Sequence, residues 1–546
     1  MKWIKKNPEI KYNDNDDIIT KLLKIYGIKN PKFFFNPNEE SLNDPYKLKN
    51  IDILTDRIIQ AVKNKEKVCI SVDSDFDGIA GSTMFYRYLS NFTNNVYLVW
   101  SDERKHGIEH QIKKIDNDTD LLIIIDSSTN SSETCQYLSK EKNIDILIID
   151  HHGFDVANYY ATIVNPQMDD YPNKELSGTA VAWKVLQVLD DKLNVNFAND
   201  YIDLTGFSLV ADVMCHKEVE NRYLIQESFN NINNLGLKTI MQVMNVKEMN
   251  TQTIGYMIAP LINGAVRLNQ IDKAIQLLLS DNLADCGQLA HQLKEFNEKR
   301  KIVEESIFDE VFDSAKEQVK NNNNVIIIEY EKNINSNYNG LVASRISSYF
   351  HRPVLFLVYE GENLKGSFRS SNFNMRDALK DFKEVFYSLG HPPAGGTMFP
   401  ANKKDIVQNK LNELLKDEDL DPVYQYDLEV FPKDITNKLL KASEKFNLIT
   451  GRNFPPVKFK VNNLVVQERA VIGKNNDTIK FNCIDNITGE EINAIKFKTS
   501  DDWKSNLSFG DKIEVLGQIN LNKYFSYRDG EVVQKQIIMD DIRIAE

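Results

Sequence analysis

The stretch VCISVDSDFDG, residues 68–78, decides the fold. Its first five residues are small or apolar and rich in β-branched side chains, which predicts a short buried strand. Three carboxylates, Asp73, Asp75 and Asp77, follow at alternate positions, and Gly78 opens a stretch of helical character. The acids therefore lie in a strand-to-helix turn, where open α/β sheets place their chemistry. Crowded carboxylates repel one another unless a cation holds them, and Mg²⁺ or Mn²⁺ favours such oxygen ligands.

The same pattern recurs along the chain. The apolar run 121–125 ends in Asp126, and the run 146–149 is followed by Asp150-His151-His152. Asp212 ends a further apolar segment, residues 207–211. A single Asp in such a place is commonly a turn residue or a helix cap. The whole set, with its paired histidines, instead predicts that several strand ends, the end at Asp212 included, converge on one two-metal site.

Composition limits the class of protein. A chain of 546 residues with 42% hydrophobic and 27% charged residues is expected to form several soluble globular domains. The net charge of −13 argues against a nucleic-acid binder, so that function would require basic residues gathered on one face. The apolar runs are too short for a membrane span, and the start lacks the features of a signal peptide. The five scattered cysteines show no zinc spacing and fit a reducing cytoplasm.

Organisation follows from the alternation of patterns. Strands and helices alternate over residues 61–230, which predicts a mainly parallel sheet covered by helices. A long helical pattern over residues 281–320 fits a spacer between lobes or, equally, a surface helix of one domain. A second α/β unit follows, with a glycine-rich loop at 389–396, and the short alternating strands of 451–546 indicate a small β-barrel.

With these motifs placed, the chain resembles the RecJ family of the DHH phosphoesterase superfamily over nearly its whole length. Asp-His-His alone is a weak signal, but the ordered set of motifs is specific. The segments that carry the resemblance are DSDFDG at 73–78, Asp126, DHH at 150–152, ADV at 211–213, ENR at 220–222, NGAVR at 263–267, KGSFRS at 365–370, GH at 390–391, GRNFPP at 451–456 and the final strand at 536–543. Val72, Ser71 and the pair Pro392-Pro393 depart from the usual family residues.

The resemblance implies an α/β fold with a DHH domain, a long connecting helix, a smaller DHHA1 domain and an OB-type barrel. It implies a metal-dependent exonuclease that degrades single-stranded DNA from the 5′ end to 5′-mononucleotides, in repair, recombination or replication. The expected segments are a helical lead-in (1–60), the DHH domain (61–230), a helical connector (231–320), the DHHA1 domain (321–402), a helical linker (403–450) and the OB-type domain (451–546).

The resemblance also implies a site for two divalent cations, Mn²⁺ or Mg²⁺. One cation would be held by Asp75, Asp126, His151 and Asp212, and the other by Asp73 and a shared Asp126. Asp126 would bridge the two cations, His152 would contact the scissile phosphate or support proton transfer, and Asp150 would orient a histidine. For Asp77, a catalytic role and a turn role remain open.

Substrate contacts are expected in the second half of the chain. Arg267, Arg345 and Arg369 are candidate phosphate contacts, although each could equally be a surface ion-pair residue. His391 is expected to contact the substrate, and Gly390 and Gly395 would let a strand approach the backbone. His106, beside Arg104 and Lys105, could touch phosphate, but the simpler interpretation is that it belongs to a solvated cluster. The aromatics Tyr524, Phe525 and Tyr527, near Lys523 and Arg528, fit either a base-stacking platform or the barrel core.

Two other functions compete with the exonuclease. The first is a phosphodiesterase of short oligonucleotides or cyclic dinucleotides, against which the predicted barrel argues. The second is an inactive nucleic-acid-binding scaffold, which the intact set of acids and histidines disfavours. For the exonuclease, single-stranded DNA is the expected partner, a single-strand-binding protein and a helicase are further candidates, and the chain is expected to be a cytoplasmic monomer that binds no membrane.

Overall fold

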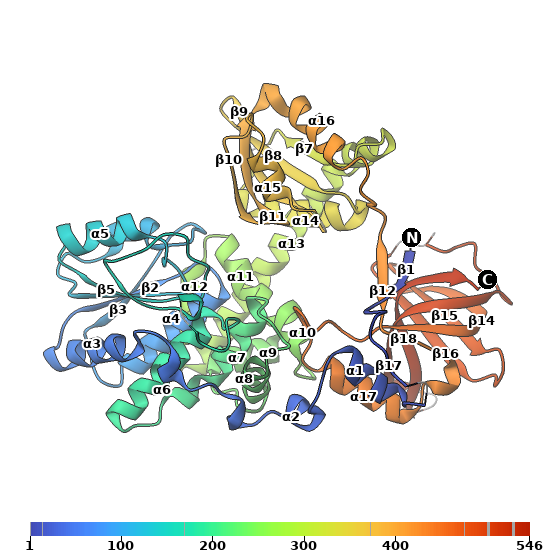
Figure 1. Ribbon diagram of the computed structural model, residues 1–546, viewed down its shortest axis with the longest axis horizontal. Coiled ribbons are helices and arrows are strands. Elements are labelled where there is room, and N and C mark those ends of the chain that lie inside the picture. The colour runs from blue at the N-terminus through green and yellow to red at the C-terminus, as the bar shows by residue number, and fades with distance from the viewer. Residues whose placement is uncertain are drawn as a thin grey trace.

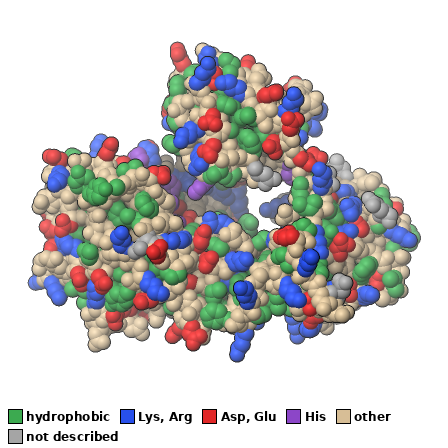
Figure 2. Space-filling view, in the orientation of Figure 1, with side chains coloured by type: hydrophobic (Ala, Val, Ile, Leu, Met, Phe, Trp, Pro, Cys, Tyr) green, Lys and Arg blue, Asp and Glu red, His purple; other side chains and the backbone are tan. Residues whose placement is uncertain are grey.

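The structure, a computed structural model, describes residues 2–13, 15–168, 170–332, 334–371, 373–473, 476–499, 503–526 and 530–545. They form three bodies: a first α/β domain, a second α/β domain and a barrel domain (Figure 1). The space-filling view shows a central opening between them (Figure 2). Both chain ends lie at the barrel domain. Within these ranges, no helix combines the length and the apolar character that a membrane crossing requires.

The first α/β domain contains the predicted parallel sheet. Its five strands run in the order β3-β2-β4-β5-β6, and all of their pairings are parallel. Alternate residues face opposite layers: Ile70 and Ile123 pack against α3, α4 and α6, whereas Cys69 and Leu122 pack against α5. This alternation explains the continuous apolar runs, because a sheet covered on both faces has no polar side. The bounds are α3 Ile51–Asn64, β2 Val68–Val72, α4 Phe76–Leu89, β3 Val96–Trp100, β4 Leu121–Ile125, α5 Ser132–Glu141, β5 Asp145–Ile149, β6 Thr162–Val164 and α6 Gly178–Leu193.

The helices that follow extend the core of this domain. Leu237, Ile262 and Leu278 belong to the same buried cluster as the sheet, so much of the segment predicted as a connector packs on the first domain. The 38-residue helix α13 leaves this cluster at Leu293 and enters the core of the second domain at Ile307. It is therefore a spacer between lobes, one of the two alternatives that the pattern left open. The bounds are α7 Ile202–Ala211, α8 Val219–Asn230, α9 Leu235–Val243, α10 Thr251–Thr253, the π-helical turn η7 Ile254–Ile258, α11 Ala259–Arg267, α12 Ile271–Leu279 and α13 Leu283–Lys320.

The second α/β domain is built on a mixed sheet in the order β10-β11-β9-β8-β7. The predicted glycine-rich loop is wrong in detail, because residues 387–400 form the hairpin β10–β11. Val407 and Leu411 of α16 pack on this sheet, so the first part of the predicted linker belongs to this domain. The bounds are β7 Ile326–Tyr330, α14 Asn339–Phe350, β8 Val354–Glu360, β9 Asn363–Arg369, α15 Met375–Lys380, β10 Tyr387–His391, β11 Ala394–Pro400 and α16 Lys404–Leu414.

The barrel domain closes because β14 pairs with both β15 and β17. The N-terminal segment packs on it: Leu22, Phe34 and Phe35 share the barrel's buried cluster, and β1 pairs in parallel with β12. The start of the chain therefore covers the barrel rather than leading directly into the first sheet. The bounds are β1 Lys2–Lys5, α1 Ile18–Ile25, α2 Pro31–Phe35, β12 Val423–Tyr426, β13 Leu428–Val430, α17 Asn437–Asn447, β14 Phe459–Ile472, β15 Thr478–Asp485, β16 Glu491–Phe497, β17 Lys512–Ser526 and β18 Gly530–Ile544.

A buried arginine joins the barrel domain to the first α/β domain. The guanidinium of Arg222 donates to the carbonyl oxygens of Phe34, His216 and Ile449 at 3.0, 3.0 and 3.1 Å. It also lies over the ring of Phe34, with the carbon of the guanidinium 4.0 Å from the ring centroid. Burial lowers the pKa of Arg222 to about 9. One side chain thus ties together the N-terminal segment, the first domain and the linker to the barrel.

Arg222→Lys should loosen this junction, because an ammonium group on a shorter stem cannot reach all three carbonyls. The buried acceptors left unpaired should cost about 2–4 kcal/mol of stability. The thermal midpoint should fall, and limited proteolysis should begin in the linker around residues 447–455. Arg376→Ala, at an exposed ion pair with Asp377, is the control and should change neither readout. An unchanged proteolysis pattern in Arg222→Lys would contradict the role of this arginine as a junction.

Candidate metal centre

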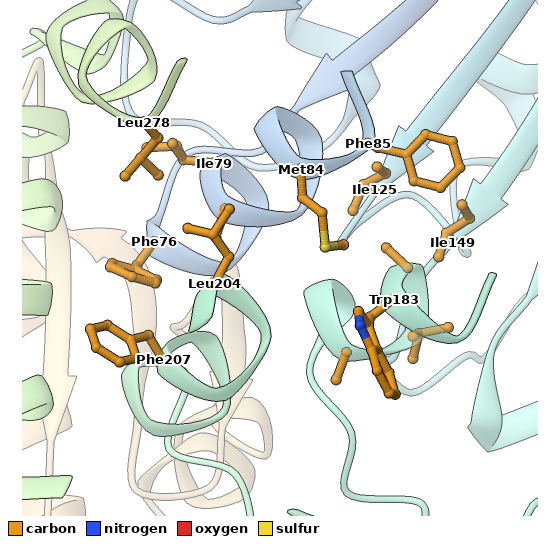
Figure 3. Packing of buried hydrophobic residues seen from close by; sticks show 14 of the residues in the cluster. Phe76, Ile79, Met84, Phe85, Ile125, Ile149, Trp183, Leu204, Phe207 and Leu278 are labelled. Carbon is orange, nitrogen blue, oxygen red and sulfur yellow. The ribbon is translucent and has the colours of Figure 1, made fainter. Parts of the chain in front are cut away.

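The turn after β2 carries three acids, Asp73, Asp75 and Asp77, and a buried phenylalanine, Phe76, between the last two. Phe76 points into the core beside Phe207 and Leu204, which fixes the turn from below (Figure 3). Asp75 caps α4 by accepting from the backbone N–H of Gly78 at 3.1 Å. Position 78 must be glycine, because a Cβ there would lie 2.5 Å from the Cβ of Asp73. The sequence thus folds into a tight turn that brings the three carboxylates close together.

Asp77 holds the start of a second helix. Its carboxylate accepts from the backbone N–H groups of Gly178 and Thr179 at 2.7 and 2.9 Å, which caps α6. The same carboxylate lies 3.9 Å from Nε2 of His151. Asp77 is therefore both a turn residue and a member of the site, which resolves the two roles that the sequence left open.

Asp126 and His151 meet at the centre of the cluster. Asp126 follows β4 with a left-handed backbone (φ +68°), and its Oδ1 lies 3.1 Å from Nε2 of His151. Both of these atoms are buried without a hydrogen-bond partner in the part of the chain that the structure describes. Gly178 makes room for Asp126, since a Cβ there would lie 2.6 Å from Asp126 Oδ1. Two buried, unpaired ligand atoms that face each other are what a bound cation would satisfy.

Asp212 completes this group from a helix end. Its Oδ2 lies 3.4 Å from Nε2 of His151. The residue follows α7, so the apolar segment before it is a helix and not a strand. The next residue, Val213, is exposed and has φ +55°, which is unusual for a β-branched side chain.

The structure brings the ligand atoms of the site together in three groups, and within each group they lie within 4.8 Å of one another. The groups are Asp77, His151 and Asp212; Asp73, Asp75 and His106; and Asp126, Asp150, His151 and His152. Asp77 thus lies beside His151 and Asp212, where the resemblance implied Asp75, and which acid binds which cation stays a prediction. The reason is geometric: Asp77 lies one step further along, in the first turn of α4, and faces α6.

Burial and mutual repulsion raise the pKa values of several acids in the site. Burial, and then repulsion from Asp77 and Asp75, raise the pKa of Asp212 to about 8. The same causes raise the pKa of Asp126 well above its usual range. Burial and repulsion from Asp73 and Asp77 also raise the pKa of Asp75. A divalent cation would relieve this repulsion, so the donor set fits Mg²⁺ or Mn²⁺ on its charge as well as on its orphaned atoms.

Asp150 and His152 form a pair beside the cluster. Asp150 accepts from Thr129 and from the backbone N–H groups of His151 and His152, and its Oδ1 lies 2.8 Å from Nδ1 of His152. Burial would raise the pKa of Asp150, but His152 holds it below the usual range. Burial lowers the pKa of His152, but its bond to Asp150 outweighs this and raises it to about 9. The half-exposed imidazole of His152 is thus charged and oriented, and free to meet an anion.

Two contributors escaped the sequence reading. Nδ1 of His106 lies 2.5 Å from Oδ2 of Asp73, so this histidine belongs to the site and not to a solvated cluster. Asn263 accepts from the backbone N–H of Phe76 at 2.9 Å and so anchors the turn of acids to α11. The signals were present, in the basic run 104–106 and the motif at 263–267, but only the fold shows what these side chains touch.

A group of arginines gathers around Arg267, and the visible walls of the central opening carry Lys, Arg and His side chains (Figure 2). Burial lowers the pKa of Arg267 to about 9, and the nearby charges of Arg104, Arg300 and Arg369 add to this effect. Such a concentration of guanidinium groups is the local basic patch that a chain of net charge −13 requires. The group brings Arg267 and Arg369 close to each other. Both also donate hydrogen bonds within the chain, and their contact with phosphate stays a prediction.

Arg345 does not join this group. It forms a two-pronged ion pair with Glu305, at 2.8 and 2.6 Å, and lies over the ring of Phe308. These donors are used within the chain, which favours the ion-pair alternative for Arg345, and its contact with phosphate stays a prediction.

The hairpin β10–β11 carries the remaining predicted contacts. His391 is exposed at the hairpin tip. Gly390 has φ +114°, and a Cβ there would lie 2.7 Å from the Cα of Gly395, so these glycines let the two strands meet closely. The side chains of Tyr524 and Phe525, and all of Tyr527, lie outside the described residues.

Three regions match family models. Residues 67–207 match the DHH family N-terminal domain, residues 322–417 the DHHA1 domain, and residues 426–536 the RecJ OB domain. Their order along the chain is the order expected from the motifs.

Known proteins resemble the chain over most of its length. A putative prophage-derived single-strand DNA-specific exonuclease, YorK of Bacillus subtilis, is 28% identical over 94% of each chain. The single-stranded-DNA-specific exonuclease RecJ of Bacillus subtilis is 26% identical over 94% of this chain and 66% of its own length. The structure of Thermus thermophilus RecJ with Mn²⁺ superposes with a TM-score of 0.78, at 21% identity, over 97% of this chain and 76% of that one. In the order of its three domains and over most of its length, the chain is similar to DHH-family proteins of the RecJ type.

Proposed function

We propose that this chain is an exonuclease that hydrolyses single-stranded DNA with the help of two divalent cations, Mn²⁺ or Mg²⁺. The observation that carries the proposal is the convergence of Asp77, Asp126, His151 and Asp212, with Asp73 and Asp75 beside them. The names of the relatives, single-strand DNA-specific exonucleases, supply the substrate class.

The residues divide the chemistry between them. Asp73 and Asp75 would hold one cation, Asp77, His151 and Asp212 the other, and Asp126 would reach both with its two oxygens. The bound cations would supply a nucleophilic hydroxide at neutral pH and neutralise charge on the phosphate. His152, charged and held by Asp150, would donate to the scissile phosphate. Asp150 acts through this histidine and needs no contact with substrate.

The arginine group favours cleavage from the 5′ end. A terminal phosphate carries more negative charge than an internal diester, so a cluster of guanidinium groups binds a strand end that bears phosphate best. When the 3′ oxygen of the first nucleotide leaves, the remaining strand keeps the phosphate at its new 5′ end. Each cut therefore returns a strand that the same arginines bind, and it releases a 5′-mononucleotide.

Other features bear on the cellular setting. All six acids and the histidines of the site come from one chain, so we propose a monomer. The five cysteines are buried free thiols, which supports a reducing cytoplasm. We propose further partners, a single-strand-binding protein and a helicase, which would supply single strands from duplex DNA. The proposed setting is DNA repair, recombination or replication.

Mn²⁺ should bind the folded chain more tightly as pH rises toward about 8. Below that pH the carboxyl of Asp212 keeps its proton in the metal-free state, and a cation must displace it. The sign for stability is the opposite: an unfolded Asp ionises near pH ~4, so the metal-free chain loses stability as pH rises from about 4 to about 8. Calorimetric titration with Mn²⁺ across this range is the measurement, and Asp126→Asn is the control that should lose binding. An affinity that does not change with pH would contradict the account.

End-labelled strands should reveal both reaction and polarity. With Mn²⁺, a 5′-phosphorylated single strand should release mononucleotides from its 5′ end, faster than a 5′-hydroxyl strand and far faster than duplex. Asp126→Ala should abolish hydrolysis while the chain stays folded. Release from the 3′ end would overturn the polarity, turnover limited to very short or cyclic substrates would favour the competing phosphodiesterase, and no turnover would favour the inactive scaffold.

The paired histidines should separate by their readouts. His152→Ala should lower kcat by about 100-fold or more and change Mn²⁺ affinity little, because this residue is proposed to touch phosphate. His151→Ala should lower both, because Nε2 of His151 faces the acids. Equal loss of Mn²⁺ affinity in the two variants would show that the roles are wrongly divided.

A further inference from the structure

One face of the helical segment 251–267 stays accessible, and apart from the partly accessible Gly255 and Met257 the rest of the segment is buried. The segment comprises α10, the π-helical turn η7 and α11, and all of its residues are described. Gln252 and Tyr256 are its exposed residues, and Pro260, Asn263 and Arg267 are partly accessible. These positions recur every three or four residues, so they form one stripe along the helix.

The stripe connects the barrel to the metal centre. At its start, Thr251 exchanges hydrogen bonds with Thr450 in the linker to the barrel, at 2.7 and 3.0 Å. Gln252 lines a cavity of about 510 Å³ whose other wall is residues 518–522 of β17. At its far end, Asn263 holds the turn of acids and Arg267 belongs to the arginine group.

Tyr256 lies between these ends of the stripe, in the turn η7, which packs against α7. A Cβ on Gly255 would lie 4.0 Å from Cγ1 of Val210 in α7, and α7 leads directly to Asp212. Tyr256 is 81% exposed and belongs to the widened turn η7. A large aromatic side chain is thus presented on the stripe between the barrel and the arginine group.

We propose that Tyr256 stacks on a nucleobase of the substrate strand as the strand passes from the barrel to the metal centre. This inference rests on the proposed function and adds a base-contacting residue to it. Stacking on an aromatic ring accepts every base, as an enzyme without sequence preference needs. Glu248 and Glu444 line the cavity at the barrel end and repel phosphates, so the bases face this wall.

The order of residues along the stripe fits the polarity proposed above. With the terminal phosphate at Arg267 and the scissile phosphate at the acids, the strand continues in its 3′ direction past Tyr256 and Gln252 to the barrel. Tyr256 would therefore contact nucleotides that follow the cleavage point, and short substrates would not reach it.

The test compares Tyr256→Ala and Tyr256→Phe with the wild-type chain. Tyr137→Ala, at a half-exposed tyrosine on the outer helix α5, is the matched control. Long single strands carry the fluorescent base 2-aminopurine at successive positions, and an added Asp126→Asn prevents cleavage during the binding measurement. Stacking should quench one position with the wild-type ring and with Tyr256→Phe, and Tyr256→Ala should restore its fluorescence. Affinity for the long strand should fall roughly 5- to 100-fold in Tyr256→Ala alone, since each stack contributes that much.

The outcomes separate this inference from the proposed function. If the wild-type chain neither cleaves nor binds single strands, both ideas fail. If the wild-type chain cleaves and binds them while Tyr256→Ala shows the same quenching and affinity, the stacking role alone is overturned. Circular dichroism of each variant confirms that it is folded, and an exposed ring is expected to be dispensable for folding.

Discussion

Mutual repulsion between buried carboxylates is the constraint on which the rest of this structure depends. Asp126 and Asp77 are almost fully buried, and each of the site's acids lies within the field of several others. Water cannot screen the repulsion between these buried carboxylates, so the packing of the surrounding residues must hold them in place. Phe76 in the core, the cradle glycines 78 and 178, and the bond from Asn263 to the turn each remove a way for the acids to move apart. The parallel sheet serves this end by bringing its strand ends to one edge.

The three bodies are arranged around the edge of the parallel sheet at which the acids lie. The helix α13 sets the second α/β domain across from the acids, and Arg222 fixes the barrel on the other side. The visible walls of the central opening carry Lys, Arg and His side chains, and the arginines gather around Arg267, which suits a polyanion as partner. A chain with a net charge of −13 can bind such a partner because its positive charge is concentrated where the substrate would lie.

Much of this could be predicted from the sequence, for physical reasons. Apolar runs followed by acids predict both a buried parallel sheet and the edge at which the acids gather, because strand ends share one edge. The rest could not be predicted, because it depended on distances between segments remote in sequence. Asp77 lies beside His151 because α6 lies beside the first turn of α4, and Arg345 pairs with Glu305 on another helix. The packing of α1 and α2 on the barrel, and the contact of His106 with Asp73, likewise exist only once the chain has folded.

Anomalous diffraction at the manganese edge, from crystals of the full chain grown with Mn²⁺, tests the central claim most directly. The account predicts two peaks: one coordinated by Asp77, Asp126, His151 and Asp212, and a second by Asp73, Asp75 and Asp126. A single peak, or peaks that Asp77 does not reach, would contradict the division of the acids. No peak at this edge of the sheet would contradict the metal centre itself.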